Sequence, residues 1–277
     1  METEGDLDGY LDEFVDLTDQ FFVWLNDLPR PEPGSDFAVD AEHDQLPVST
    51  YTRTVWGLSC AADHLMVLRR LMPDELETRF VAPFTLLRSV YEVACQTAWL
   101  IGPEEPEERI TRLYQLFTLE VTNAKTALAR MHAPFPGGDE LVSSWAVGVT
   151  DEVDRLKGML MQRRGTAATP KILDTITGGQ AIIDARSGMD PAFSGPTSSD
   201  GRDLDPLPVS IWRMHSGAAH SRMWIYDSLT KSDGPDDDGR IPLLGSLNQI
   251  GISMQVNLYV LKVLAEIVND RVVAPNE

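Results

Sequence analysis

The chain has few cysteines and histidines for its length. Among 277 residues there are two cysteines, Cys60 and Cys95, and five histidines. Both cysteines lie in apolar runs, which predicts small buried hydrophobic residues, because a disulfide framework or a zinc site needs more ligands at short spacing. We therefore expect a reducing, cytoplasmic location, with no metal and no other cofactor.

Basic residues are also scarce, with 23 Lys and Arg against 43 Asp and Glu and a formal charge of −20. The acidic excess is concentrated near the N-terminus: residues 1–44 contain 14 acidic residues and one basic residue, a balance of −13, which leaves −7 for residues 45–277. Non-specific nucleic-acid coating draws its affinity from clustered Lys and Arg, so this balance argues against it. The acidic segment is instead suited to a basic protein partner.

Signals for membrane insertion are weak as well. The first residues lack the basic start and apolar stretch of a signal peptide. The one long uncharged stretch, residues 241–261, contains two Asn and two Gln, which favours a buried core helix over a membrane span. We expect no membrane partner.

Hydrophobic residues recur every three or four positions, and no alternating strand pattern is visible. This predicts an all-α protein, an up-and-down bundle of about seven helices. The helices are expected at residues 7–28, 49–72, 83–102, 106–131, 139–164, 207–229 and 243–268, with a short one at 170–177. Several of them carry more apolar surface than one four-helix core covers, which predicts a homodimer.

The composition also indicates how the chain is divided. Residues 1–48 are expected to form an acidic N-terminal helix followed by a proline-containing linker, and residues 49–277 a helical bundle domain. Within that domain, residues 178–208 are rich in Gly, Ser, Asp and Pro, which predicts a mobile loop.

The predicted helix over residues 207–229 carries a narrow polar stripe on an otherwise apolar surface. Its members, Arg213, Ser216 and His220, are three and four residues apart. Arg213 and His220 are therefore almost eclipsed, with an axial offset of about 10 Å. We expect this stripe to face inward, where a buried Arg and His require partners or a ligand.

A second polar stripe, formed by Arg88, Glu92 and Gln96, lies on the predicted helix over residues 83–102. If both stripes face inward, Glu92 meets Arg213 or His220, and Arg88 offers its guanidinium to an anion. His215 lies on the apolar face of its own helix, which favours a core histidine within the same network over a ligand-binding residue.

Together these motifs resemble uncharacterised helical proteins related to the HEPN superfamily. The resemblance covers roughly residues 50–230. It is carried by Arg88-x-x-x-Glu92, Trp99, Arg109-x-x-Arg112 and the Arg213…Ser216…His220 motif. It implies a HEPN-like core, a homodimer and, in the nuclease members, metal-independent endoribonuclease activity of a toxin or defence type.

In that chemistry the ribose 2′-hydroxyl attacks the adjacent phosphate of RNA. The resemblance implies that His220 acts as general base or acid, Arg213 stabilises the charge on the phosphorane, and Ser216 positions the substrate.

Two other interpretations of the same residues stay open. In one, the Arg, His and Glu side chains form a buried structural network in a non-catalytic homodimeric scaffold or regulatory binding protein. In the other, Arg88 or Arg213 binds a small anionic ligand within the bundle.

Overall fold

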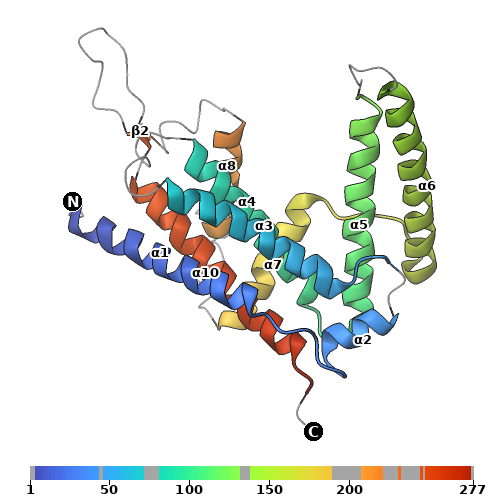
Figure 1. Cartoon of the computed structure of the whole chain (residues 1–277), viewed down its shortest axis with the longest axis horizontal. Coiled ribbons are helices and arrows are strands. Elements are labelled where there is room, and N and C mark those ends of the chain that lie inside the picture. Colours follow the sequence, from blue (N-terminus) through green and yellow to red (C-terminus); the bar gives the residue numbers. More distant parts are fainter. Residues whose placement is uncertain are drawn as a thin grey trace, which may run out of the picture.

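The computed structural model describes residues 4–43, 46–71, 81–131, 138–188, 207–220, 230–231, 244–245 and 247–275. These residues form nine helices and one short antiparallel pairing of two-residue strands (Figure 1). The helices are α1 (Glu4–Asn26), α2 (Asp36–His43), α3 (Thr50–Arg70), α4 (Ala82–Ile101), α5 (Pro106–Leu128), α6 (Gly138–Arg164), α7 (Ile172–Ser187), α8 (Leu207–Ala219) and α10 (Leu247–Val272). The strands are β1 (Thr230–Lys231) and β2 (Leu244–Gly245). The all-α prediction is confirmed.

Helices α5 and α3 begin at residues whose chemistry explains the boundary. Pro106 occupies the first turn of α5, where it needs no hydrogen-bond donor, and Glu107 and Glu108 lie beside the positive end of the helix dipole. The hydroxyl of Ser49 accepts a hydrogen bond from the backbone N–H of Thr52, 3.1 Å away, and so caps the N-terminus of α3.

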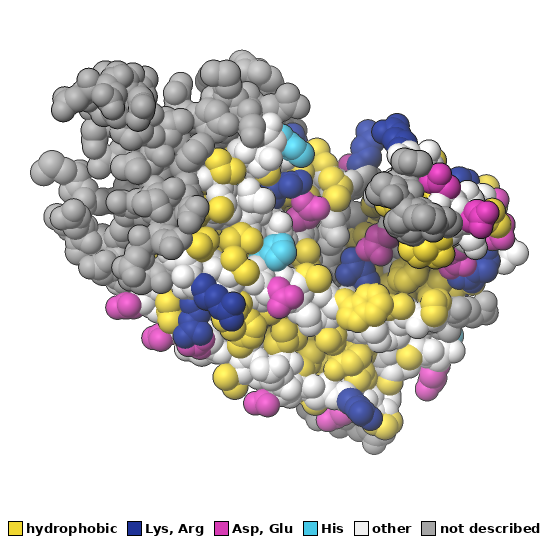
Figure 2. Space-filling model, turned by 45° about the horizontal axis from the view of Figure 1, so that its top comes forward, with side chains coloured by type: hydrophobic (Ala, Val, Ile, Leu, Met, Phe, Trp, Pro, Cys, Tyr) yellow, Lys and Arg dark blue, Asp and Glu magenta, His cyan; other side chains and the backbone are white. Residues whose placement is uncertain are grey.

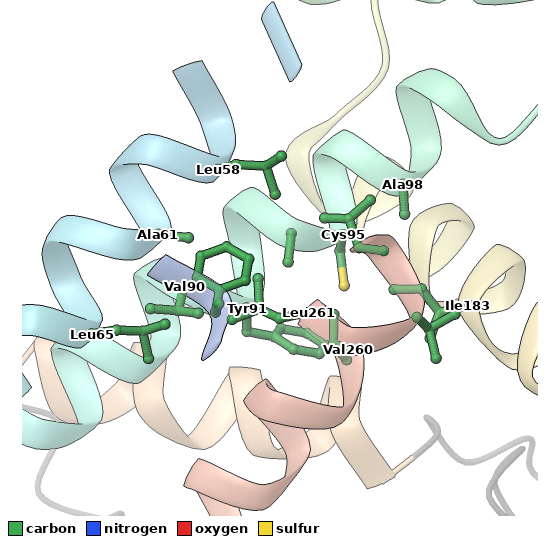
Figure 3. Packing of buried hydrophobic residues seen from close by; sticks show 14 of the residues in the cluster. Leu58, Ala61, Leu65, Val90, Tyr91, Cys95, Ala98, Ile183, Val260 and Leu261 are labelled. Atoms are coloured by element: carbon green, nitrogen blue, oxygen red, sulfur yellow. The ribbon is translucent and has the colours of Figure 1, made fainter. Parts of the chain in front are cut away.

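Helix α4 lies at the centre of the molecule, and α3, α7, α8 and α10 pack around it. Figure 3 shows side chains from α3, α4, α7 and α10 pointing into one core. Buried residues from these helices include Leu58, Leu65, Val90, Tyr91, Cys95, Ile183 and Leu261. Because α4 is covered on several sides, its sequence is apolar over most of its circumference.

Helix α7 extends well beyond the predicted short helix at residues 170–177. It continues to Ser187 and ends at Gly188, which adopts a left-handed conformation with φ of 61°. The prediction of a loop from residue 178 is therefore wrong for its first ten residues, and residues 189–206 lie outside the described part of the chain.

The two glycines at positions 178 and 179 suggested a loop, but they are required by the packing of α7 against α4. A Cβ atom at Gly179 would lie 1.9 Å from the carbonyl oxygen of Cys95, and one at Gly178 would lie 2.7 Å from the Trp99 ring. The absence of side chains allows the two helix backbones to approach closely, which offsets the low helix propensity of glycine.

The acidic region expected to be a linker also contains a helix. Within it, α2 buries Phe37 and Asp40 completely or nearly so, and the Phe37 ring packs edge-on against Tyr51, with 5.4 Å between the ring centroids. Helix α1 packs along α10 and also contacts α3 (Figure 1). The described parts of residues 1–48 therefore contribute to the packed molecule, because the burial of Phe37 offsets the acidic composition of α2.

Among the described residues, helix α10 is by length and composition long and apolar enough to cross a membrane. Its candidate span covers Gln249–Val272, and 56% of the most apolar window is buried inside the structure. It packs against α4, α1 and α7, as a core helix does.

Candidate functional site

Helix α8 presents one face to the core and another to solvent. It packs against α4 and α7, and its core side carries Ile211, Trp212 and Ala218, which are 4%, 8% and 2% exposed. The polar stripe lies on the other side, where Arg213 and His220 are exposed and Ser216 is half-buried.

The expected inward orientation of this stripe is therefore wrong. That expectation relied on apolar residues covering most of the predicted helix, including Met223 and Ile225, which lie outside the described residues. In the described part most buried apolar residues lie on the side away from the stripe, while buried Val209 lies one turn before Arg213. The His220 N–H donates a hydrogen bond to the Ser216 carbonyl at 3.1 Å, which keeps His220 in helical register with Arg213.

Arg88 and Glu92 bind each other and α8, although not at the predicted residues. Their side chains form an ion pair of 3.2 Å and are 23% and 20% exposed. The Trp212 indole N–H donates to Glu92 at 3.3 Å, and the Arg88 guanidinium lies over the Trp212 ring, 5.6 Å from its centroid. Glu92 thus meets Trp212 in place of Arg213 or His220, because Trp212 is the side chain that α8 directs at α4.

Gln96 lies one turn beyond Glu92 on α4 and is half-buried. The N-terminal part of the second polar stripe, Arg88 and Glu92, therefore faces α8.

His215 is buried, with 1% of its surface exposed, and packs beside Phe84 at a ring-centroid distance of 5.2 Å. Its Nε2 lies 2.9 Å from the hydroxyl of Ser253, which itself donates to the carbonyl of Gln249. The hydroxyl has one proton, so we assign it as acceptor from Nε2–H, which leaves Nδ1 unprotonated. Burial, with a smaller contribution from nearby Arg88, lowers the pKa of His215 to about 3. His215 is therefore a neutral core residue.

Arg109, the first residue of the Arg109-x-x-Arg112 motif, is 0% exposed. Its guanidinium binds both carboxylate oxygens of Asp40 at 2.8 to 3.1 Å and donates to the carbonyls of Pro103 and Glu104. Arg271 joins the same region by pairing with Asp36 and Glu104. This cluster ties α2 and α10 to the start of α5, and the partner of Arg109 was missed because it lies in the supposed linker.

Arg112 stacks on Trp99, with its guanidinium 4.9 Å from the ring centroid, and donates to the backbone carbonyl of the same tryptophan. The structure therefore brings together Trp99 and Arg112, which are both part of the sequence resemblance. Their contact joins α4 and α5.

The cysteines and histidines form no candidate metal centre: within the described ranges no group of three or more His, Cys, Asp or Glu side chains could hold an ion. Cys95 is buried, as expected, whereas Cys60 is exposed and the expectation of its burial is wrong. Neither forms a disulfide. The exposure of Cys60 follows from its place on α3, whose core face carries Leu58, Ala61 and Leu65.

Charge on the face shown in Figure 2 is mixed. The Lys and Arg side chains of the described residues are scattered among acidic and hydrophobic ones and form no continuous basic patch. Any anion recognised on this face must be held by a few side chains.

Comparison of the chain with protein-family models, with curated proteins and with solved structures found no match.

Proposed function

We propose that this chain is a HEPN-like homodimeric protein that cleaves RNA without a metal ion, using Arg213, Ser216 and His220 on the outer face of α8. The observation that carries the proposal is the exposure of Arg213 and His220 on one helix face. A polymer as large as RNA reaches a catalytic side chain only from solvent, and these two residues meet that requirement while His215 does not.

The side-chain types suit the chemistry. The ribose 2′-hydroxyl attacks the adjacent phosphorus and the bond from phosphorus to the 5′ oxygen breaks, so one product ends in a 2′,3′-cyclic phosphate and the other in a 5′-hydroxyl. His220 takes up the proton of the 2′-hydroxyl or supplies one to the leaving oxygen. Arg213 stabilises the negative charge that develops on the phosphate oxygens, and Ser216 contributes a hydroxyl between them.

The surroundings of α8 support a fixed presentation of these groups. Trp212, next to Arg213 in sequence, is held by Glu92 and Arg88, and His215, next to Ser216, is held by Ser253. These contacts fix the orientation of α8 about its axis. Catalytic groups on a rigid helix are positioned more accurately than groups on a loop.

The test is RNA cleavage by the full chain in the presence of EDTA, with a synthetic single-stranded RNA and a transfer RNA as substrates. We expect cyclic-phosphate products, and a loss of about 10²-fold or more in rate for Arg213→Ala and for His220→Ala. Arg130→Ala and His43→Ala are matched controls, because both residues are exposed and lie on other helices or their ends. Cleavage that is unchanged in the two α8 variants would refute the proposal.

A second candidate is a non-catalytic scaffold or regulatory binding protein. It is favoured by the finding that Arg88, Glu92 and His215 are engaged in contacts between helices. Absence of RNA cleavage by the intact, folded chain would favour this candidate.

A further inference from the structure

A groove lies between α1 and α10, which run alongside each other at an edge of the molecule (Figure 1). Its volume is about 680 Å³. The indole N–H of Trp24 donates a hydrogen bond to the side chain of Asn269 at 3.0 Å and joins the two helices near their C-terminal ends. The groove is lined mainly by hydrophobic side chains from both helices, among them Phe14, Leu17, Phe21, Leu258, Leu261 and Ala265.

The groove has the dimensions of a short helix. On α1 its lining extends from Glu13 to Trp24, which corresponds to about 16 Å at the helical rise of 1.5 Å per residue. Leu17 and Leu258 are half-buried, so part of each side chain is accessible from the groove. An amphipathic helix binds such a surface by inserting apolar side chains that are three, four and seven positions apart. The groove therefore accommodates about three turns of a bound helix.

The rim of the groove is acidic. Glu13 on α1 and Glu266 on α10 line it and are exposed, and exposed Asp16 lies one turn beyond Glu13. In sequence, residues 4–26 contain seven acidic residues and no basic one. Among the described residues that line the groove, Lys262 is the one with a basic side chain. A helix that carries Lys or Arg beside its apolar face is complementary to this rim.

We propose that the groove between α1 and α10 binds a basic amphipathic helix of another protein. A second copy of this chain is disfavoured as the occupant, because a chain with a formal charge of −20 is repelled by an acidic rim. An acidic helix is disfavoured for the same reason. The groove is formed by α1 and α10, so the inference does not depend on the RNA cleavage proposed for α8.

The probes are two fluorescent helical peptides of about 18 residues, long enough to span the groove. Both have leucines at the same positions, three and four apart, and their remaining positions are mostly Lys in one peptide and mostly Glu in the other. Fluorescence anisotropy measures their binding to the full chain at constant ionic strength. We expect saturable binding of one Leu/Lys peptide per chain, and binding of the Leu/Glu peptide that is weaker by about tenfold or more.

Filling the groove tests its apolar part. Ala265→Trp places a large side chain in the lining and is expected to weaken the binding of the Leu/Lys peptide by about tenfold or more, because the peptide's leucines lose their pocket. Ala127→Trp is the matched control, since Ala127 is exposed on α5, and it leaves the affinity unchanged.

Reversing single charges tests the rim. Glu13→Lys is expected to weaken the binding of the Leu/Lys peptide by about tenfold, and Lys262→Glu to strengthen it, because these changes act in opposite directions on the same cationic partner. Glu140→Lys is the matched control: it makes the same charge change at an exposed position of α6 and has little effect. Glu13 and Lys262 are both exposed, so these variants keep the fold even if Ala265→Trp does not.

Several outcomes would overturn the proposal. They are a lack of saturable binding, equal or tighter binding of the Leu/Glu peptide, or a loss of affinity in Glu140→Lys as large as that in Glu13→Lys, which would show attraction to the whole acidic chain. Self-association of the wild-type chain in sedimentation velocity that Ala265→Trp abolishes would identify a second copy as the occupant and would also overturn it. Circular dichroism of each variant shows whether it is folded.

Discussion

Two arginine-containing regions of this protein use their charges in opposite ways. At the contact of α2, α5 and α10, Arg109 is completely buried and bound by Asp40 and two backbone carbonyls. At the outer face of α8, Arg213 is exposed and shares one helical face with exposed His220 and half-buried Ser216. A buried charge must be satisfied by the fold, whereas an exposed one is accessible to a ligand, so the second region is the better candidate for function.

Removing the buried guanidinium tests this contrast most severely. We expect Arg109→Ala to lower the free energy of unfolding by about 3–5 kcal/mol, because it leaves the carboxylate of Asp40 buried without its partner. Urea denaturation measures the effect. The double variant Arg109→Met with Asp40→Leu recovers part of the loss, and a stability change for Arg109→Ala as small as that of exposed Arg130→Ala would contradict the structural role.

The glycine contact between α7 and α4 should give the next largest effect. Gly179→Ala places a Cβ atom against the Cys95 backbone and is expected to cost about 1–3 kcal/mol, at the upper end because a backbone carbonyl cannot rotate away. Gly158→Ala is the control, since a Cβ there meets nothing within 4 Å and alanine improves helix propensity by about 1 kcal/mol. If both substitutions stabilise the protein, the close α7·α4 approach is wrong.

The buried histidine beside the α8 surface predicts a pH dependence. The pKa of His215 is lowered in the folded state to about 3, so the unfolded chain takes up a proton first as the pH falls. The associated stability is fully present above the unfolded pKa of about 6.5 and is lost as the pH decreases toward 3.

Between pH 7 and pH 5 this contribution amounts to about 2 kcal/mol. The acidic residues also titrate in this range, so the measurement is the difference between wild type and His215→Gln in urea titrations at both pH values. Parallel losses of stability in the two proteins would show that His215 is not held neutral.

The smallest effect on stability is expected at the α8 surface itself. Arg213→Ala and His220→Ala should each change the free energy of unfolding by no more than about 0.5 kcal/mol, because both side chains are exposed. Thermal unfolding measures this directly. A large destabilisation by either variant would make the two regions alike and would remove the basis for assigning function to α8.

Helix periodicity and helix-ending residues predicted much of the fold. The pattern placed α4 within a residue or so of its bounds, and Pro106 identified the start of α5. The failures have a common cause. Phe37 of α2 and Gly179 of α7 are explained by a partner on another helix, so local composition indicated a linker and a loop in their place.

The candidate site was predicted in part. The residues of the two polar stripes were identified, but their pairing was not, because a helical pattern gives the angle between side chains and not the neighbour that each one meets. Trp212 has a largely apolar ring, yet its indole N–H is the group that meets Glu92. Ser253, the partner of His215, lies 38 positions away on another helix.

The sequence by itself determined the helical class, most helix boundaries and the placement of Arg213, Ser216 and His220 on one helix face. These depend on local backbone preferences and on a period of 3.6 residues, which neighbouring positions specify. Only the tertiary structure decided that Arg109 is buried against Asp40 while Arg213 and His220 face solvent. Burial depends on which helices pack against each face, and those contacts join residues that are far apart in the chain.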